Sequence, residues 1–322
     1  MKQEDDKTLK YDKKERIDKI TKGFFLACAI LCGSFVIFII VFLLIKGFYP
    51  FFHNYSVTEG ETTKQSFVAF FTSSRWLYNG TGGMIFLLLT TIYTTILSLL
   101  ISVPTSIFTA LFIVRIAPKQ LRIVFQTCIE LLASIPSVIY GLFGLGVICP
   151  IINKLPVETF GGSSILSAVI ILALMSIPTI TLLSITALET VSKKMVNASL
   201  ALGASETQTN FKIVLRCAKS GIFAGIILGT GRALGEATAV QMVIGNGNNG
   251  SGFLNIFNIG NTLTSAMLSG IGEASGIGYD TRFSLGLILI LVTLLTSFLL
   301  NLIKKKMIEK ETGMKKVKHA KR

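Results

Sequence analysis

The sequence predicts an all-α integral membrane protein with six transmembrane helices and both termini in the cytoplasm. Composition is the first reason: of 322 residues, 51% are hydrophobic and 15% are charged, whereas soluble domains average about 25% charged residues. The mean hydropathy of +0.67 points the same way. The second reason is a set of apolar runs that reach the roughly 20 residues a helix needs to cross a bilayer. The third is the uneven placement of the basic residues.

Six apolar runs define the expected spans. They cover residues 23–45, 84–114, 131–153, 165–188, about 221–244, and 283–303. The first run is too long for the core of a signal peptide and no A-x-A-like cleavage site follows it, so we expect it to be retained. The second exceeds the bilayer thickness, which predicts tilt, a kink at Pro104 or an extension beyond the lipid. Pro136 interrupts the third run.

The basic residues set the expected orientation. Counted over the expected loops, 25 Lys and Arg lie in inner segments and 4 lie in outer segments. The inner segments are 1–22, 115–122, 189–220 and 304–322, and the outer segments are 47–83, 152–164 and 245–283. Since short cytoplasmic loops carry the excess of Lys and Arg, this bias predicts cytoplasmic termini.

The chain therefore divides into five expected regions. These are a charged cytoplasmic arm (1–22), a first transmembrane helix (23–46), an aromatic-rich extracytoplasmic loop (47–83), a membrane domain (84–303) and a basic cytoplasmic tail (304–322). The net charge of +14 is concentrated at the inner side. We therefore expect the tail to anchor the topology and contact the lipid bilayer, and we expect no nucleic-acid partner.

Several chemistries have no support in the sequence. The five cysteines show no metal-ligand spacing and no disulfide framework, so neither a metal site nor a cofactor is expected. The chain has no G-x-x-x-x-G-K-[ST] stretch to hold the phosphates of ATP. We assign no catalytic residue and do not expect an enzyme.

The inner loop 189–220 predicts a helix–turn–helix. A short helix over 196–202 ends at Gly203, the residue type that commonly follows a helix C-terminus. Ser205 lies three residues before Gln208, the spacing of a capping box that starts a second helix. Phe211, Val214 and Leu215 then give an apolar stripe. Such a hairpin either folds against its own bundle or docks into a groove on a partner.

The same loop resembles the EAA loop of ABC-importer permeases. That pattern is E-A-A, three residues, Gly, nine residues, Ile, any residue, Leu, Pro, and the glycine, isoleucine and leucine fall on register here. Asn197, Ser199 and Arg216 replace the family's glutamate, second alanine and proline. The resemblance implies that this loop contacts an ATPase. The implied coupling residues are Asn197, Ala198, Gly203, Ala204, Phe211, Ile213 and Leu215.

The sequence of the expected fifth span resembles one particular family of ABC-importer permeases. The stretch "GRALGEATAVQMVIGN" is similar to the corresponding helix of the PstC family of phosphate-importer permeases, with Ala237 where a threonine is usual. "ELLASIPSVIYGLFG" and "GNTLTSAMLSGIGEA" also resemble that family. The likeness covers most of 84–303 and implies a MetI-like permease core. It further implies a bacterial cytoplasmic membrane, a PstA-like second permease subunit, a PstB-like ATPase dimer that binds the ATP, and an extracytoplasmic phosphate-binding protein.

Two charged residues within the fifth span are the candidate substrate residues. Arg232 and Glu236 are expected on one helix face because they are four residues apart. An unpaired charge at mid-membrane costs at least about 2.5–3.5 kcal/mol. One interpretation is therefore a buried ion pair that only holds helices together. In the other, Arg232 offers bidentate hydrogen bonds to a passing oxyanion, and Glu236 either orients the arginine or moderates its attraction so that the anion can leave. The resemblance supports the second.

Two further groups of residues are expected near the pathway. Glu130, close to the inner end of the third span, either reaches cytoplasmic water or belongs to the substrate pathway. Glycines recur along the fifth span and predict close helix contact, with a partner subunit or with the third span, and a bendable helix. They are Gly221, Gly225, Gly229, Gly231 and Gly235.

The sequence thus favours a transmembrane subunit that forms half of an ATP-driven phosphate import pathway by alternating access. A permease for sulfate or molybdate would keep the hairpin at 196–216 but not the extended match around Arg232. A channel or an integral membrane enzyme would need neither feature. These alternatives remain open at the level of sequence.

Overall fold

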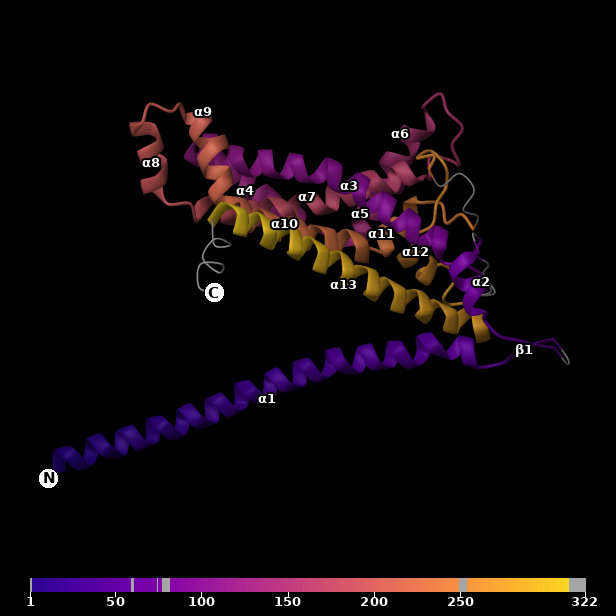
Figure 1. The fold of residues 1–322 in the computed structure, drawn as a ribbon, viewed down its shortest axis with the longest axis horizontal. Coiled ribbons are helices and arrows are strands. Elements are labelled where there is room, and N and C mark those ends of the chain that lie inside the picture. Colours follow the sequence, from indigo (N-terminus) through magenta and orange to yellow (C-terminus); the bar gives the residue numbers. More distant parts are fainter. Residues whose placement is uncertain (1, 59–60, 74, 77–81, 249–253, 313–322) are drawn as a thin grey trace, which may run out of the picture.

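A computed structural model describes residues 2–58, 61–73, 75–76, 82–248 and 254–312, and it is almost entirely helical (Figure 1). The helices are α1 Lys2–Phe52, α2 Phe67–Thr72, α3 Ile85–Leu111, α4 Lys119–Ser134, α5 Ser137–Phe143, α6 Cys149–Asn153, α7 Ile165–Glu189, α8 Lys193–Ala201, α9 Glu206–Thr209, α10 Leu215–Gly235, α11 Thr238–Val243, α12 Leu263–Leu268 and α13 Gly276–Thr312. The π-helical segments are η1 Phe112–Ile116, η2 Gly144–Ile148 and η3 Asn210–Val214. Strands β1 Tyr55–Thr58 and β2 Glu61–Thr63 form an antiparallel hairpin.

Four helical segments are long and apolar enough to cross a membrane. Within the described residues these are Ile17–Phe52, Ile85–Ile116, Ile165–Glu189 and Gly276–Met307. A fifth candidate is the pair formed by α4 and by Ser137–Asn153, which meet at an angle of 95°. The chain is therefore a multi-pass membrane protein by the length and composition of its helices. The helix α10, which contains most of the expected fifth span, is not in this set.

The charged arm and the first expected span form one helix. The helix α1 begins at Lys2 and continues through the apolar run to Phe52. Its apolar part is exposed along most of its length, and α1 contacts α13 near its C-terminal end. There, Gly47 lies close to the carbonyl of Phe283, and Ser284 donates a hydrogen bond of 2.6 Å to the Gly47 carbonyl. Figure 1 shows α1 diverging from the bundle away from this contact.

The centre of the bundle is α7, with α3 and α10 packed along it. The contact face of α3 carries buried hydroxyls at three- and four-residue intervals, including Thr95, Ser98, Ser102 and Ser106. The hydroxyl of Ser106 donates to the Ile177 carbonyl on α7 over 3.2 Å. Small side chains let helix backbones approach closely in membranes, where the lipid offers helices no hydrophobic reason to associate.

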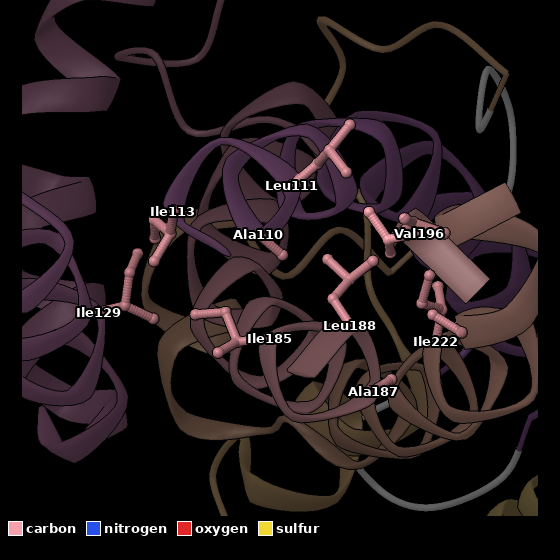
Figure 2. Packing of buried hydrophobic residues seen from close by; sticks show 11 residues of the cluster. Ala110, Leu111, Ile113, Ile129, Ile185, Ala187, Leu188, Val196 and Ile222 are labelled. Carbon is pink, nitrogen blue, oxygen red and sulfur yellow. The ribbon is translucent and has the colours of Figure 1, made fainter. Parts of the chain in front are cut away.

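An apolar cluster closes the end of the bundle that carries α8 and α9. Figure 2 shows Leu111 of α3, Leu188 of α7 and Val196 of α8 on one side of this cluster, with Ile185 of α7 on the other side beside Ile129. Val214 of η3 also belongs to it and is fully buried. This packing fixes α8 and η3 relative to α7. In Figure 1, α1 begins and α13 ends toward this same end.

The expected third and fifth spans are both broken. The helix α4 ends at Ser134, and Ile135 and Pro136 adopt extended backbone before α5 begins. The expectation that Pro136 interrupts this span is confirmed. The expected continuous fifth helix is wrong, because α10 ends at Gly235 and Glu236 is extended before α11. The two short helices α5 and α11 pack on each other, with Gly141 against Met242 and Ala239.

The expected helix–turn–helix is confirmed in its local geometry. The turn after α8 contains Gly203 at φ +84°, a conformation that glycine adopts without strain. Ser205 and Gln208 form the expected capping box at the start of α9. The second helix does not end within the loop 189–220, however, because α9, η3 and α10 follow one another without a break up to Gly235. Arg232, near the end of α10, therefore belongs to the same continuous helical stretch that begins in the hairpin.

Candidate transport site

A cavity of about 730 Å³ lies among α7, α10 and α13. Its lining is mostly apolar on α10, polar on α13, and formed by Thr179 and Leu183 on α7. The lining residues that bear polar or charged side chains are Thr179, Arg232, Ser297, Asn301 and Lys304. Among the described residues there is no group of three or more His, Cys, Asp or Glu that could hold a metal ion. The chemistry of this cavity is therefore that of two cations and several hydrogen-bond donors.

Arg232 lies in the last turn of α10 and lines this cavity. One guanidinium nitrogen, Nη1, donates a hydrogen bond of 3.0 Å to Oγ1 of Thr179 on α7. The side chain is half-buried, so part of the guanidinium is accessible from the cavity. A guanidinium has five N–H donors in a planar fork, and the contact with Thr179 uses only one nitrogen. The others can bind an oxyanion in a bidentate manner.

Glu236 has a different position from the one expected. Because α10 ends at Gly235, Arg232 and Glu236 do not share a helix face. The Glu236 carboxylate accepts a 3.0 Å hydrogen bond from the Ala239 N–H in the first turn of α11, and its carbonyl accepts one of 2.8 Å from Thr264. The contacts of these described residues include no ion pair between Arg232 and Glu236. The expectation that the two residues share a helix face is therefore corrected: in this structure Thr179 contacts Arg232, and the Glu236 carboxylate contacts the start of α11.

Three of the five singled-out glycines lie against α7. A Cβ atom on Gly221 would be 2.5 Å from the Cβ of Ala187, and one on Gly229 would be 2.6 Å from Cγ1 of Ile180. Gly225 lies close to the same helix. The contact they allow within this chain is with the fourth expected span, not the third. Added Cβ atoms on Gly231 and Gly235 would meet open space, and these two residues border cavities instead.

Glu130 lies away from the cavity. Its side chain is exposed on α4 and accepts a 3.3 Å hydrogen bond from Gln126 one turn earlier. It is not among the residues that line the space around Arg232. The structure therefore does not bring Glu130 together with Arg232.

Sequence reasoning missed four polar residues of the cavity. Thr179 was hidden by its apolar neighbourhood, although it follows Pro178 in an otherwise hydrophobic helix. By sequence, Ser297 and Asn301 fall in the expected sixth span and Lys304 in the expected basic tail. Their spacing of four and three residues was the available signal, because it places polar side chains on one face of an apolar helix.

The hairpin presents a second candidate surface, at the end of the bundle. Val196 and Val214 pack into the protein's own core, whereas Leu202 is 89% exposed and Phe211 is 47% exposed. Arg115 of η1 donates a 2.8 Å hydrogen bond from Nε to the side-chain oxygen of Asn210 in η3. One face of the hairpin is thus fixed to the bundle, and the opposite face leaves apolar side chains uncovered.

Helices broken next to a charged cavity are the architecture of a membrane transport subunit. The family model of the binding-protein-dependent transport system inner membrane component matches residues 102–309, and the chain belongs to this family. The match includes α7, α10, the hairpin and most of α13. It therefore covers every residue that lines the cavity around Arg232.

Individual relatives agree with the family. The chain is 33% identical to the probable ABC transporter permease protein YqgH of Bacillus subtilis, over 84% of this chain and 85% of that protein. It is 34% identical to the phosphate transport system permease protein PstC of Pasteurella multocida, over 72% of this chain and 78% of that protein. The fold is similar to that of a solved bacterial alginate ABC transporter, with a TM-score of 0.61, 16% identity, and coverage of 90% of this chain and 97% of that one.

Proposed function

We propose that this chain is a transmembrane subunit of an ATP-driven importer of inorganic phosphate. The observation that carries the proposal is Arg232, a half-buried arginine held by Thr179 at the wall of a cavity of about 730 Å³. A fixed guanidinium suits a tetrahedral oxyanion because it offers several N–H donors in one plane. The relatives named as PstC phosphate permeases support phosphate as that oxyanion.

Arg232 attracts the anion without trapping it. Part of its hydrogen-bonding capacity is already used by Thr179, and the cavity is open enough to admit water, which weakens the attraction between charges. Transport requires an attraction strong enough for entry and weak enough for release. The helix break at Glu236 lies one turn away from Arg232 and gives this part of the chain a place to bend.

The proposed assembly has the parts that the family implies. A PstA-like subunit completes the pathway, a PstB-like ATPase dimer hydrolyses ATP, and an extracytoplasmic binding protein delivers phosphate. Six spans with cytoplasmic termini in a bacterial inner membrane are the proposed topology, with α10 and α11 forming the fifth span. The exposed Leu202 and Phe211 of the hairpin contact the ATPase. Because α9, η3 and α10 are continuous, a shift of the hairpin moves Arg232.

Transport by the assembled complex tests this proposal. The chain is reconstituted in proteoliposomes with its second permease subunit and ATPase, and labelled anion is supplied on the binding protein. We expect phosphate accumulation that requires ATP and that excess sulfate or molybdate does not reduce. Accumulation of sulfate or molybdate in its place would contradict phosphate as the substrate. Anion flux through the isolated chain without an ATPase would contradict the importer class.

A further inference from the structure

The second half of α13 carries a polar stripe within an apolar surface. Ser297, Asn301 and Lys304 are spaced by four and three residues, so they lie on one face of the helix. Over a rise of 1.5 Å per residue the stripe is about 10 Å long. The exposed residues on the other faces are apolar: Leu295, Phe298, Leu299, Leu302 and Ile303.

This stripe faces Arg232. All three residues line the same cavity as Arg232 and Thr179, which lie on the opposite helices α10 and α7. Among the three consecutive lysines at the end of the apolar run, Lys304 lines the cavity and is half-buried, whereas Lys305 and Lys306 are exposed. The cavity thus has one cation at the end of α10 and a second further along α13, with a hydroxyl and an amide in between.

Apolar side chains would fit these positions better if α13 met only lipid or another apolar helix. Polar residues within membrane spans usually face a bundle interior or a watery path. A lysine at a membrane edge often only extends its ammonium group to the headgroups. That explanation accounts for Lys305 and Lys306, but it does not account for Ser297 and Asn301 on the same face as Lys304.

We propose that Ser297, Asn301 and Lys304 form an exit subsite for the transported oxyanion, which receives it from Arg232. This inference rests on the proposed function. Ser297 and Asn301 donate hydrogen bonds to the anion, and Lys304 supplies the second positive charge toward the end of the bundle that carries α8 and α9. Two binding sites of moderate affinity in series let the anion pass from the first to the second, because neither site holds it in a deep energy minimum.

Site-directed labelling tests the subsite without relying on transport rates. In the assembled complex, with the five native cysteines replaced by serine, Ser297→Cys and Asn301→Cys are treated with a negatively charged methanethiosulfonate reagent. Phe298→Cys is the matched control on a neighbouring face of α13. We expect the stripe positions to react roughly tenfold faster than the control, because thiol reactivity depends on access to water. Inorganic phosphate should slow the reaction at the stripe only.

The outcomes separate this inference from the proposed function. Equal labelling at the stripe and at Phe298→Cys would overturn the exit subsite even if the complex transports phosphate. Fast labelling that sulfate or molybdate slows and phosphate does not would keep the subsite and contradict phosphate as the substrate. Fast labelling that no anion slows would overturn the subsite, because water but not the oxyanion would then reach it.

Substitutions at two adjacent lysines test the exit subsite by measuring transport. Lys304→Gln and Lys305→Gln remove the same charge from adjacent positions, and only the first lines the cavity. We expect Lys304→Gln to lower the maximal rate of phosphate uptake several-fold while the complex assembles normally, and Lys305→Gln to leave it unchanged. Equal effects of the two changes, or loss of the second permease subunit from the Lys304→Gln complex, would overturn the proposal in favour of a subunit interface.

Discussion

Thr179 of α7 accepts a hydrogen bond of 3.0 Å from Nη1 of Arg232, and this contact joins α7 and α10 at the cavity. This hydrogen bond fixes the direction of the guanidinium. The other guanidinium nitrogens remain available to bind a ligand. Holding one donor also limits how closely Arg232 can approach an anion. The hydroxyl is therefore expected to tune the binding of the substrate, not to provide it.

The first prediction concerns this hydroxyl. Thr179→Val keeps the shape of the side chain and removes the acceptor, and Thr179→Ser keeps the acceptor. We expect Thr179→Val to change the apparent affinity for the loaded binding protein or the maximal uptake rate by several-fold, and Thr179→Ser to stay close to the unaltered protein. Equal transport kinetics in all three proteins would show that Thr179 does not position Arg232.

The second prediction concerns the link between the hairpin and α3. Arg115 donates to Asn210 across two π-helical segments, a type of helix irregularity found often at functional sites. We expect Asn210→Leu to leave ATP hydrolysis by the complex near normal and to reduce the phosphate moved per ATP. Simultaneous measurement of both rates checks this. A proportional loss of hydrolysis and uptake would instead indicate a defect in binding the ATPase.

The third prediction concerns the glycines. Gly229→Val places side-chain atoms where Ile180 already packs, so we expect it to destabilise the contact of α10 with α7 by several kcal/mol. Gly231→Ala is the control, because its Cβ atom would meet open space. The prediction is tested by measuring the melting temperature of the purified complex in detergent for both variants. Equal melting temperatures would contradict the packing of α10 on α7.

The fourth prediction concerns the contact between β1 and the start of α13. The hydroxyl of Tyr55 donates a 2.7 Å hydrogen bond to Asp280, and burial, followed by this bond, raises the pKa of Tyr55 above its usual value. We expect Tyr55→Phe to lower the free energy of unfolding by about 1 kcal/mol.

The pH dependence of that difference has a defined sign. Since the pKa of Tyr55 is higher in the folded state than in the unfolded state, the protonated hydroxyl stabilises the fold fully below the ordinary tyrosine range near 10. The stabilisation is lost as the pH rises further, through the folded-state value. Unfolding of both proteins at pH values below that range should give a constant difference. A difference that disappears toward neutral pH would contradict a protonated Tyr55 as the source.

Local patterns in the sequence predicted local structure well. The capping box of Ser205 and Gln208 and the turn at Gly203 depend only on neighbouring residues, and both are present. The interruption at Pro136 follows from the missing N–H of proline. These features do not require knowledge of what packs against them.

Contacts between segments that are distant in the sequence could not be predicted from such local patterns. Thr264 donates to the carbonyl of Glu236, 28 residues earlier in the chain, at the point where α10 ends. The spacing of Arg232 and Glu236 therefore suggested a shared helix face that does not exist. Thr179 is 53 residues from Arg232, and no pattern in α7 marks it as a partner. The polar stripe on α13 had a sequence signal in its spacing, but only the fold shows that it faces the same cavity.

The central claim is that Arg232 binds the transported anion, and uptake by Arg232→Gln tests it most directly. Removing a charged hydrogen-bond donor from the pathway is expected to lower phosphate uptake about 10- to 100-fold, while the complex still assembles and hydrolyses ATP. Arg232→Lys should restore only part of the rate, because lysine lacks the planar fork. Arg75→Gln, which removes an exposed arginine outside the cavity, serves as the control. Normal phosphate uptake by Arg232→Gln in the assembled complex would contradict the account.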